Sequence, residues 1–325
     1  MVYPAAALLV STFIVTVIAC SFFIKRMKQL QFGQQVRADG PLTHSTKAGT
    51  PTMGGAVFIP IAALAALIAA GLSPLLYTVL LVALGCGLVG FLDDYLKVAR
   101  HRSLGLRARS KLAAEAAIAI ILIILLRQLG LYSTEVVLPF VSLEIDLGLF
   151  YPLLIFLIIA AASNSVNLTD GVDGLAAGIA VIVLAAYGYI ACFTGKTEIA
   201  LFCAALSGAC AGFLVYNRNP ARLFMGDVGS LALGGAFAAL AVVTKTELLL
   251  ILIGGVFVIE ALSVIAQVIS FRLFGRRILR MSPLHHHFEL KGWSEWRVVI
   301  TFWAAAVICA FSGVLVYTRQ YNGQF

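Results

Sequence analysis

The sequence predicts an all-α polytopic membrane protein, because its composition and the recurrence of long apolar windows exclude a soluble domain. Of the 325 residues, 61% are hydrophobic and only 12% are charged, and the mean hydropathy is +1.01. About 20 consecutive apolar residues suffice for a helix to cross a membrane, and such windows recur along the whole chain. We therefore expect a single integral membrane domain over residues 1–325.

Ten apolar windows are present, and each predicts one transmembrane helix. The first is preceded by no basic residue and followed by Lys25, Arg26 and Lys28. This order is the reverse of that in a cleaved signal peptide, so the window is expected to remain as a permanent span. The windows cover residues 3–24, 53–71, 75–92, 112–129, 147–166, 175–193, 199–216, 229–244, 248–271 and 298–318.

The distribution of basic residues predicts the orientation of these helices. The loops after the first, third, seventh and ninth windows hold 19 of the 23 lysine and arginine residues. Because basic loops stay in the cytosol, both termini are expected on the extracytoplasmic side. The net charge of +8 follows from this topology and also favours anionic lipid and phosphate-bearing ligands. No interleaving of aromatic and basic residues indicates nucleic acid. In the outer loop, residues 130–148 alternate around Pro139 and predict a short hairpin.

Two adjacent carboxylates, Asp93 and Asp94, end the third apolar window. The carboxyl end of a helix already carries partial negative charge, so carboxylates there are unfavourable unless cations pair with them. Lys97 lies four residues after Asp93 and can pair with it. Consecutive helix residues point about 100° apart, so we expect Lys97 to face only one of the two carboxylates. The other then needs a metal, a proton or a substrate; a solvated helix end with one ion pair is the alternative.

The loop between the fifth and sixth windows, residues 164–175, joins polar residues and glycines at the amino end of a helix. Such ends bind anions through free N–H groups, and Gly171 and Gly174 allow a ligand to approach closely. One aspartate has the alternative role of a helix cap, but the loop holds more polar groups than a cap requires. We expect substrate contacts or catalysis from Asn164, Asn167, Asp170 and Asp173.

The loop between the seventh and eighth windows, residues 217–230, repeats this design. Asp227 stands with Gly226 and Gly229, which predicts a site for a metal-bound phosphate; capping of the eighth helix is the alternative. Carboxylate oxygens without a thiolate cluster favour Mg²⁺, which takes one or two carboxylates and completes its shell with phosphate and water. Manganese is expected to substitute for it.

Two further cytosolic segments hold candidate phosphate ligands. Residues 47–55 place Lys47 and hydroxyl groups before a glycine-containing helix start, without the spacing of a P-loop. The other segment contains three consecutive histidines, for which surface solvation and zinc binding are the alternatives. We expect one or two of them to hold phosphate or to orient an acidic group, and the rest to serve structure; they are His285, His286 and His287.

Together these segments place carboxylates, a lysine and histidines over an apolar core, where a hydrophilic phosphate donor can meet a lipid-borne acceptor. Phosphoryl transfer of this kind needs a metal, a positioned nucleophile and cations. A transporter is the rival class, favoured by the number of spans and by Glu260 in the ninth window. Apart from Glu260 and Glu115, few charged groups lie within the spans, and no internal repeat is evident. The role of Glu260 stays open between function and buried structure.

Five segments carry a specific resemblance to a known family. They are GTPTMGG at 49–55, DDY at 93–95, NLTDGVDGL at 167–175, NPARLFMGDVGSL at 219–231 and PLHHHFEL at 283–290. In this order they resemble the polyprenyl-phosphate N-acetylhexosamine-1-phosphate transferase superfamily, and the first and last resemble its phospho-N-acetylmuramoyl-pentapeptide transferase branch. The resemblance implies a ten-helix enzyme, commonly dimeric, in the bacterial inner membrane with its active site facing the cytosol.

The same resemblance implies a reaction and residue roles. Phospho-MurNAc-pentapeptide would move from UDP-MurNAc-pentapeptide to undecaprenyl phosphate, giving lipid I and UMP. A relative that uses UDP-GlcNAc is the alternative. Asp227 resembles the Mg²⁺ ligand, Asp93 and Asp94 the catalytic pair, and Asp170 a further active-site carboxylate, while Lys97 is expected to neutralise charge. The remaining roles are uridine-side contacts for Lys47, Asp173, Asn217 and Phe224, and a position near the phosphates and sugar for His285, His286 and His287.

Two mechanisms remain open at this point. In the first, the lipid phosphate attacks the sugar-linked phosphate directly, UMP leaves, and Asp93 keeps the lipid phosphate deprotonated. In the second, an aspartate carboxylate acts as the nucleophile and forms a covalent intermediate.

Overall fold

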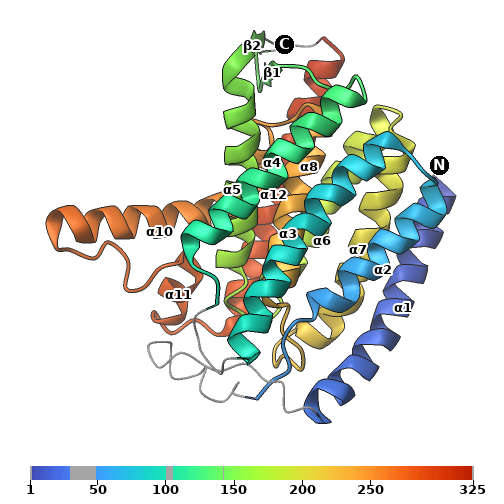
Figure 1. Cartoon of the computed structure of the whole chain (residues 1–325). Helices are drawn as coiled ribbons and strands as arrows, with labels where there is room; N and C mark the ends of the chain where they lie inside the picture. The colour runs from blue at the N-terminus through green and yellow to red at the C-terminus, as the bar shows by residue number, and fades with distance from the viewer. Residues whose placement is uncertain (1, 30–48, 100–104, 142, 324–325) are drawn as a thin grey trace.

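The computed structural model describes residues 2–29, 49–99, 105–141 and 143–323, and in them it confirms the all-α prediction (Figure 1). The only strands among these residues form one short hairpin. The long helices are α1 (Val2–Gln29), α2 (Gly55–Ala70), α3 (Pro74–Ala99), α4 (Ala108–Gln128), α5 (Tyr151–Thr169), α6 (Leu175–Phe193), α7 (Thr197–Asn217), α8 (Gly226–Thr244), α10 (Gly255–Phe274) and α12 (Glu295–Tyr321). The short elements are η2 (Gly148–Phe150), α9 (Leu250–Ile253) and α11 (Leu284–Glu289).

Eight of the described helices are long and apolar enough to cross a membrane: α1, α3, α5, α6, α7, α8, α10 and α12. Helix α2 is apolar but has 16 residues, and α4 carries Arg109, Lys111 and Glu115 in its first half. The protein is therefore a polytopic integral membrane protein, and the count of ten spans stays a prediction.

Helix α8 forms the centre of the bundle. Every residue from Val228 to Thr244 is buried, and α3 and α5 pack against it. Small residues at helix interfaces let backbones approach closely in membrane proteins, and this packing depends on glycine. A Cβ on Gly90 of α3 would overlap the backbone carbonyl of Asp227, and one on Gly55 of α2 would overlap the backbone at Gly229. The close approach brings the carboxyl end of α3 to the amino end of α8.

The opposite end of the bundle carries the predicted hairpin. Strands β1 (Glu135–Leu138) and β2 (Leu143–Asp146) pair antiparallel, as the alternating sequence predicts. Lys245, the C-cap of α8, adopts a left-handed conformation with φ of 55°. Its Nζ donates hydrogen bonds to the carbonyl of Ser133 at 2.8 Å and that of Glu135 at 2.9 Å. Helix α1 begins and α12 ends at this same end of the bundle (Figure 1).

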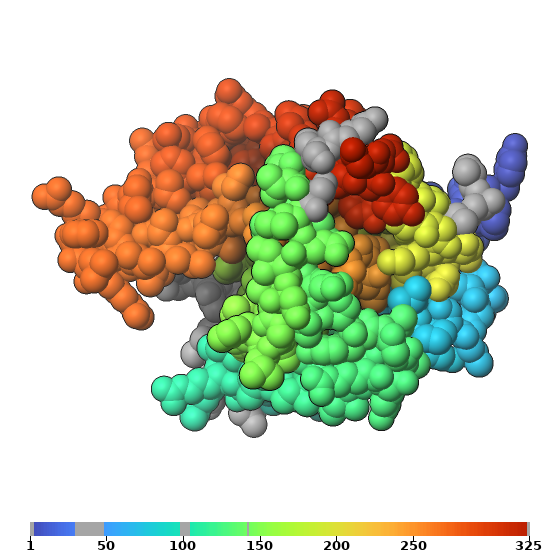
Figure 2. Space-filling model, turned by 90° about the horizontal axis from the view of Figure 1, so that it is seen from above, coloured from blue at the N-terminus to red at the C-terminus, as the bar shows by residue number. Residues whose placement is uncertain are grey.

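The prediction of one helix over residues 248–271 is wrong. Helix α9 ends at Ile253, and α10 begins at Gly255 after a break at Gly254. Helix α10 then lies across the bundle and extends away from it as an arm (Figures 1 and 2). Hydropathy measures composition only, so it does not detect a change of direction between two apolar helices. The exposed side chains of α10 include large apolar residues such as Ile259, Leu262 and Ile265, which suit contact with lipid.

Candidate active site

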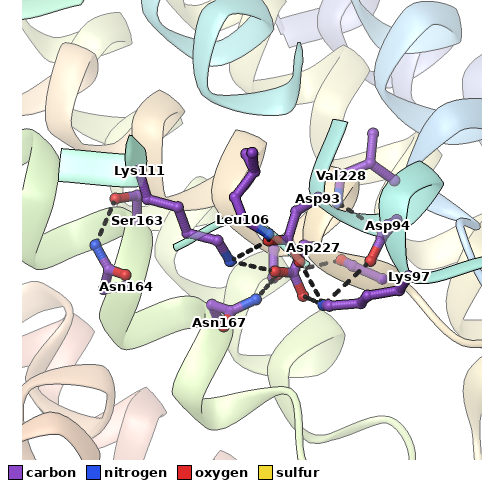
Figure 3. Close-up of polar contacts among 12 residues, drawn as sticks. Asp93, Asp94, Lys97, Leu106, Lys111, Ser163, Asn164, Asn167, Asp227 and Val228 are labelled. Atoms are coloured by element: carbon purple, nitrogen blue, oxygen red, sulfur yellow. Dashed lines mark hydrogen bonds and ion pairs between the residues drawn. The ribbon is translucent and has the colours of Figure 1, made fainter. Parts of the chain in front are cut away.

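Three aspartates from two helices form the core of the candidate site (Figure 3). Asp93 and Asp94 lie near the carboxyl end of α3, and Asp227 lies in the first turn of α8. One carboxylate oxygen of each lies within 4.8 Å of the other two. Asp93 is 1% exposed and Asp94 is 4% exposed, and Oδ2 of Asp94 accepts a hydrogen bond from the Val228 backbone N–H at 3.1 Å. The N-cap of α8 is Met225, without a side-chain cap, so the alternative of Asp227 as a cap is wrong.

Lys97 contacts all three carboxylates. Its Nζ lies 2.6 Å from Oδ2 of Asp93, 3.6 Å from Oδ1 of Asp94 and 3.0 Å from Oδ1 of Asp227. The prediction that Lys97 faces only one of the pair is wrong. Residues three and four positions apart lie on the same face of a helix, and the long lysine side chain spans the angle between Asp93 and Asp94.

Lys111, at the start of α4, is a site residue that the sequence prediction missed. Its Nζ lies 2.6 Å from Oδ2 of Asp227 and 3.1 Å from Oδ1 of Asp93. The sequence offered only one signal for it, its place among the basic residues of a loop that is predicted to be cytosolic. The same loop contributes the backbone N–H of Leu106, which donates to Oδ1 of Asp93 at 2.7 Å. A Cβ on Gly105 would overlap that carboxylate, so glycine is needed at this position.

The donor set of this cluster fits a magnesium ion. Three carboxylates and two ammonium groups leave one net negative charge, and clustered buried charges are costly unless ions of opposite sign balance them. Carboxylate oxygens are hard ligands of the kind that Mg²⁺ takes. Asp227, with 14% of its side chain exposed, is the most accessible of the three. A metal that bound there would take over contacts that Lys97 and Lys111 now make.

The loop that joins α5 to α6 lies beside this cluster. Burial, together with the charges of Asp227 and Asp94, raises the pKa of Asp170 well above its ordinary value, so Asp170 is within electrostatic reach of both. Asp173 accepts hydrogen bonds from the Ala221 N–H at 2.9 Å and from Nδ2 of Asn219 at 3.2 Å. Neither aspartate caps α6, whose N-cap is Gly174 with φ of 80°. The capping alternative is therefore wrong here too.

The three predicted asparagines bond within the protein. Nδ2 of Asn167 donates to Oγ of Ser230 at 2.9 Å and so joins α5 to α8. Nδ2 of Asn164 donates to Oε1 of Glu115 on α4 at 2.9 Å. Asn217 is 2% exposed; its Oδ1 accepts from the Gly174 N–H and its Nδ2 donates to the Leu223 carbonyl, both at 3.0 Å. All three therefore hold the framework around the carboxylates together.

The segment before α2 pairs with the segment before α8 through backbone groups. The N–H of Phe224 donates to the Pro51 carbonyl, and the N–H groups of Gly54 and Gly55 donate to the carbonyls of Phe224 and Met225, all at 2.9 Å. The Phe224 side chain is partly exposed beside this junction. Lys47, the other residue expected from this segment, lies outside the described residues.

The histidine segment divides into two parts. A Cβ on Gly171 would approach Nε2 of both His285 and His286, so these two rings lie against the loop that contains Asp170. His287 is held differently, because its Nδ1 accepts a hydrogen bond from the Arg280 N–H at 3.0 Å. Desolvation and the charges of Lys291 and Arg280 lower the pKa of His287. The structure thus brings two of the three predicted histidines to the site.

Comparison with known proteins identifies the family. A family model described as glycosyl transferase family 4 matches residues 76–245, and the signature phospho-N-acetylmuramoyl-pentapeptide-transferase signature 1 matches residues 47–59. A phospho-N-acetylmuramoyl-pentapeptide-transferase of Geobacillus kaustophilus is 51% identical over 94% of this chain and 95% of its own length. The chain belongs to this transferase family. Equally named proteins of Shouchella clausii and Desulfitobacterium hafniense are 52% and 48% identical over at least 95% of both chains.

Membership of the phospho-N-acetylmuramoyl-pentapeptide-transferase family makes this chain a membrane-embedded phosphoglycosyl transferase of peptidoglycan synthesis. The family implies a nucleotide-sugar substrate and a lipid acceptor in the membrane. The two matched regions differ in what they cover. The region matched by the family model includes Asp93, Asp94, Asp170 and Asp227, whereas the histidine segment lies beyond both matched regions. The similarity to the relatives extends over nearly the whole chain.

Proposed function

We propose that this protein transfers phospho-MurNAc-pentapeptide from UDP-MurNAc-pentapeptide to undecaprenyl phosphate and releases lipid I and UMP. The observation that carries the proposal is the cluster of Asp93, Asp94 and Asp227 with Lys97 and Lys111. It lies at one end of an apolar bundle, where a water-soluble diphosphate and a lipid phosphate can both reach it. The relatives are named as phospho-N-acetylmuramoyl-pentapeptide-transferases, which supports the sugar-peptide that we propose as the transferred group.

The cluster would hold Mg²⁺ through Asp227, assisted by Asp93 or Asp94. The ion, when bound, supplies positive charge that gathers the diphosphate oxygens and stabilises the charge on the leaving UMP. Each lysine lies within 3.1 Å of more than one carboxylate oxygen. When the ion takes over these carboxylates, the ammonium groups of Lys97 and Lys111 would become available to the phosphates. Asp173 and Phe224, on neighbouring loops, are proposed to meet the uridine side of the donor.

Direct attack by the lipid phosphate is the mechanism that we favour. Oδ1 of Asp93 accepts a hydrogen bond from the Leu106 N–H and forms an ion pair with Lys111, and Oδ2 forms an ion pair with Lys97. A carboxylate engaged on both oxygens is poorly placed to form a covalent bond to phosphorus, but it can orient an incoming phosphate through its lysines. Label exchange between UMP and the UDP-sugar without any lipid phosphate would support the covalent alternative instead.

We further propose ten spans in one domain of the bacterial inner membrane, with the carboxylate cluster facing the cytosol and both termini outside. The basic loops at the cluster end support this orientation. Single cysteines in a cysteine-free variant, at Leu149 near the hairpin and at Arg276 beyond α10, test it with a membrane-impermeant thiol reagent. In whole cells the reagent should label only the cysteine at position 149. Labelling of only the cysteine at position 276 would show that the orientation is the reverse of the proposed one. Light scattering in detergent tests the homodimer that the resemblance implies.

The deciding experiment for the reaction is UMP release by purified protein in detergent with undecaprenyl phosphate and magnesium. UDP-MurNAc-pentapeptide and UDP-GlcNAc are compared as donors. Release that depends on lipid and magnesium, from the muramoyl donor alone, is the expected result. UMP release only from UDP-GlcNAc would support the same phosphoryl-transfer reaction with UDP-GlcNAc, the alternative donor, as the substrate. No release from either donor by folded protein would contradict the proposed function and favour the transporter.

A further inference from the structure

Glu260 on α10 and His285 on α11 form a buried pair that none of the proposed steps uses. Both residues are 0% exposed. Oε1 of Glu260 accepts a hydrogen bond from the His285 backbone N–H at 3.2 Å, and Oε2 lies 3.1 Å from Nδ1 of the ring. One carboxylate therefore holds both the backbone and the ring of His285, which sets the direction in which the opposite edge of the ring points.

The other ring nitrogen, Nε2 of His285, is buried and has no hydrogen-bond partner among the described residues. It faces the backbone at Gly171, where a Cβ would lie 2.5 Å from it. Buried polar atoms are almost always bonded, and one without a partner often marks a functional contact. Gly171 adjoins Asp170 in the chain, so Nε2 points toward the loop that carries this aspartate.

His286 shows the same arrangement and His287 the opposite one. Nδ1 of His286 lies 2.6 Å from Oε2 of Glu289, and its Nε2 also faces Gly171. Nδ1 of His287 instead accepts from a backbone N–H, and this ring does not lie against Gly171. The two rings that face the site thus have a carboxylate behind Nδ1, whereas the ring that faces away has none.

We propose that Glu260 is a positioning residue that holds the ring proton of His285 on Nδ1 and thereby presents Nε2 as a hydrogen-bond acceptor. The Glu260 carboxylate already accepts the His285 backbone N–H and is placed to accept the ring N–H as well, which puts the ring proton on Nδ1. In the neutral ring Nε2 then carries a lone pair, and it takes an N–H or O–H group of the sugar-linked part of the donor. The Gly171 backbone covers Nε2, so the loop at 170–174 shifts when that group binds. This inference rests on the proposed function for its substrate class.

The test begins with the tautomer, which can be read without any activity. The chain has five histidines, so ¹⁵N labelling of histidine rings gives a simple NMR spectrum in detergent, and His285→Asn identifies the signals of His285. Wild type should show a protonated Nδ1 and a bare Nε2. Glu260→Gln should invert this, because the amide NH₂ donates to Nδ1 and moves the ring proton to Nε2. A bare Nδ1 in wild type would overturn the proposal.

The kinetic test uses two matched variants at His285. Asn places an amide nitrogen near the position of Nδ1 and lacks Nε2, whereas Gln places its amide near Nε2 and releases Glu260. Loss of one hydrogen bond corresponds to roughly tenfold in kcat/KM. We expect kcat/KM for the muramoyl donor to fall about tenfold in His285→Asn and in Glu260→Gln. In His285→Gln we expect kcat/KM for this donor to fall less, and the KM for undecaprenyl phosphate to stay unchanged.

A double variant separates positioning from a purely structural role. If Glu260 acts through His285, Glu260→Gln should add little to the kinetic loss of His285→Asn, and the melting temperature of His285→Asn should match that of wild type. The proposal would be overturned if the losses in kcat/KM of the two single variants added up in the double variant. It would also be overturned if kcat/KM fell equally for the muramoyl donor and for undecaprenyl phosphate. Should Glu260→Gln fail to fold, Glu260→Asp provides the same comparison with the carboxylate withdrawn by one methylene. Inactive wild type with the expected ring tautomer would contradict the proposed function and leave the positioning of His285 in place.

Discussion

Nζ of Lys111 on α4 lies 2.6 Å from Oδ2 of Asp227 on α8, a contact that joins residues 116 positions apart in the chain. Together with Lys97 it supplies the positive charge that lets three aspartates share one site. Replacement of Lys111 by Met should lower turnover roughly 100-fold, the loss typical when one group that stabilises developing charge is removed. Magnesium-dependent UMP release measures it.

Arg109→Met is the matched control for Lys111, because Arg109 is exposed on the same helix and its loss changes the net charge equally. We expect its activity to stay within about twofold of wild type, as is usual for exposed charges. Equal losses in both variants would mean that the overall charge at this end of the bundle matters and that the Lys111 contact does not.

Asp227→Asn should abolish magnesium-dependent turnover while the protein still folds. The amide keeps the size of the side chain but removes the negative charge that holds a divalent cation. Mn²⁺, followed by electron paramagnetic resonance, reports binding directly and without any catalysis. Asp146→Asn, at an exposed position of the hairpin, should leave both binding and turnover unchanged. Tight Mn²⁺ binding by Asp227→Asn would exclude Asp227 as the principal ligand.

Gly90→Ala should destabilise the protein and reduce its activity. The new methyl group would overlap the backbone carbonyl of Asp227, and extra methylene groups in a packed core cost about 1–3 kcal/mol. The melting temperature in detergent and the rate of UMP release should both fall, because α3 would move away from α8. Gly188→Ala is the control, since its Cβ would meet only Cys203 at 3.4 Å, and it should change neither quantity measurably.

Glu247, at the hairpin end, predicts a pH-dependent stability. It is 2% exposed and accepts a hydrogen bond from the Tyr151 hydroxyl at 2.7 Å, yet burial raises the pKa of Glu247 above its ordinary value. A raised pKa in the folded state means that folded protein binds more protons. This contribution is complete below the ordinary pKa of 4.5 and is lost as the pH rises through the folded-state value.

Glu247→Gln should therefore gain melting temperature relative to wild type as the pH rises above 4.5, because the amide stays neutral. Melting in detergent from pH 4.5 to 8 measures the difference. Glu144→Gln, at an exposed position in β2, should show no such trend. A difference that shrinks with rising pH would show that the ionised carboxylate stabilises the protein through Lys245.

Much of the fold and part of the site can be predicted from this sequence. Hydropathy locates the helices because burial and lipid exposure both demand apolar residues, and the alternation around Pro139 locates the hairpin. Asp93 and Asp94 stand out because negative charge at the carboxyl end of a helix is costly, and Asp227 stands out because it lies between Gly226 and Gly229 at the amino end of a helix. Lys111 does not stand out, since any basic residue in a loop that is predicted to be cytosolic satisfies the positive-inside rule equally well. Only the packing of α4 shows which one reaches Asp227.

Other features depend on geometry that no local pattern encodes. The break at Gly254 separates two apolar helices of similar composition, so it leaves the hydropathy profile unchanged. Glu260 and His285 are 25 positions apart, and their pairing follows from the path of the chain after α10. Lys97 reaches both Asp93 and Asp94 because its side chain is long, which an argument from helix angles alone does not capture.

The junction between the segments before α2 and α8 consists of main-chain hydrogen bonds at Pro51, Gly54 and Gly55. Such bonds do not depend on which side chain the partner residue carries, so any residue that keeps its backbone N–H can replace Phe224 without weakening the junction. The chemistry of the side chain at this position and the integrity of the fold are thus separable properties. Position 224 can therefore be varied among residues other than proline, which would remove the N–H that bonds to Pro51, and the junction is expected to stay intact.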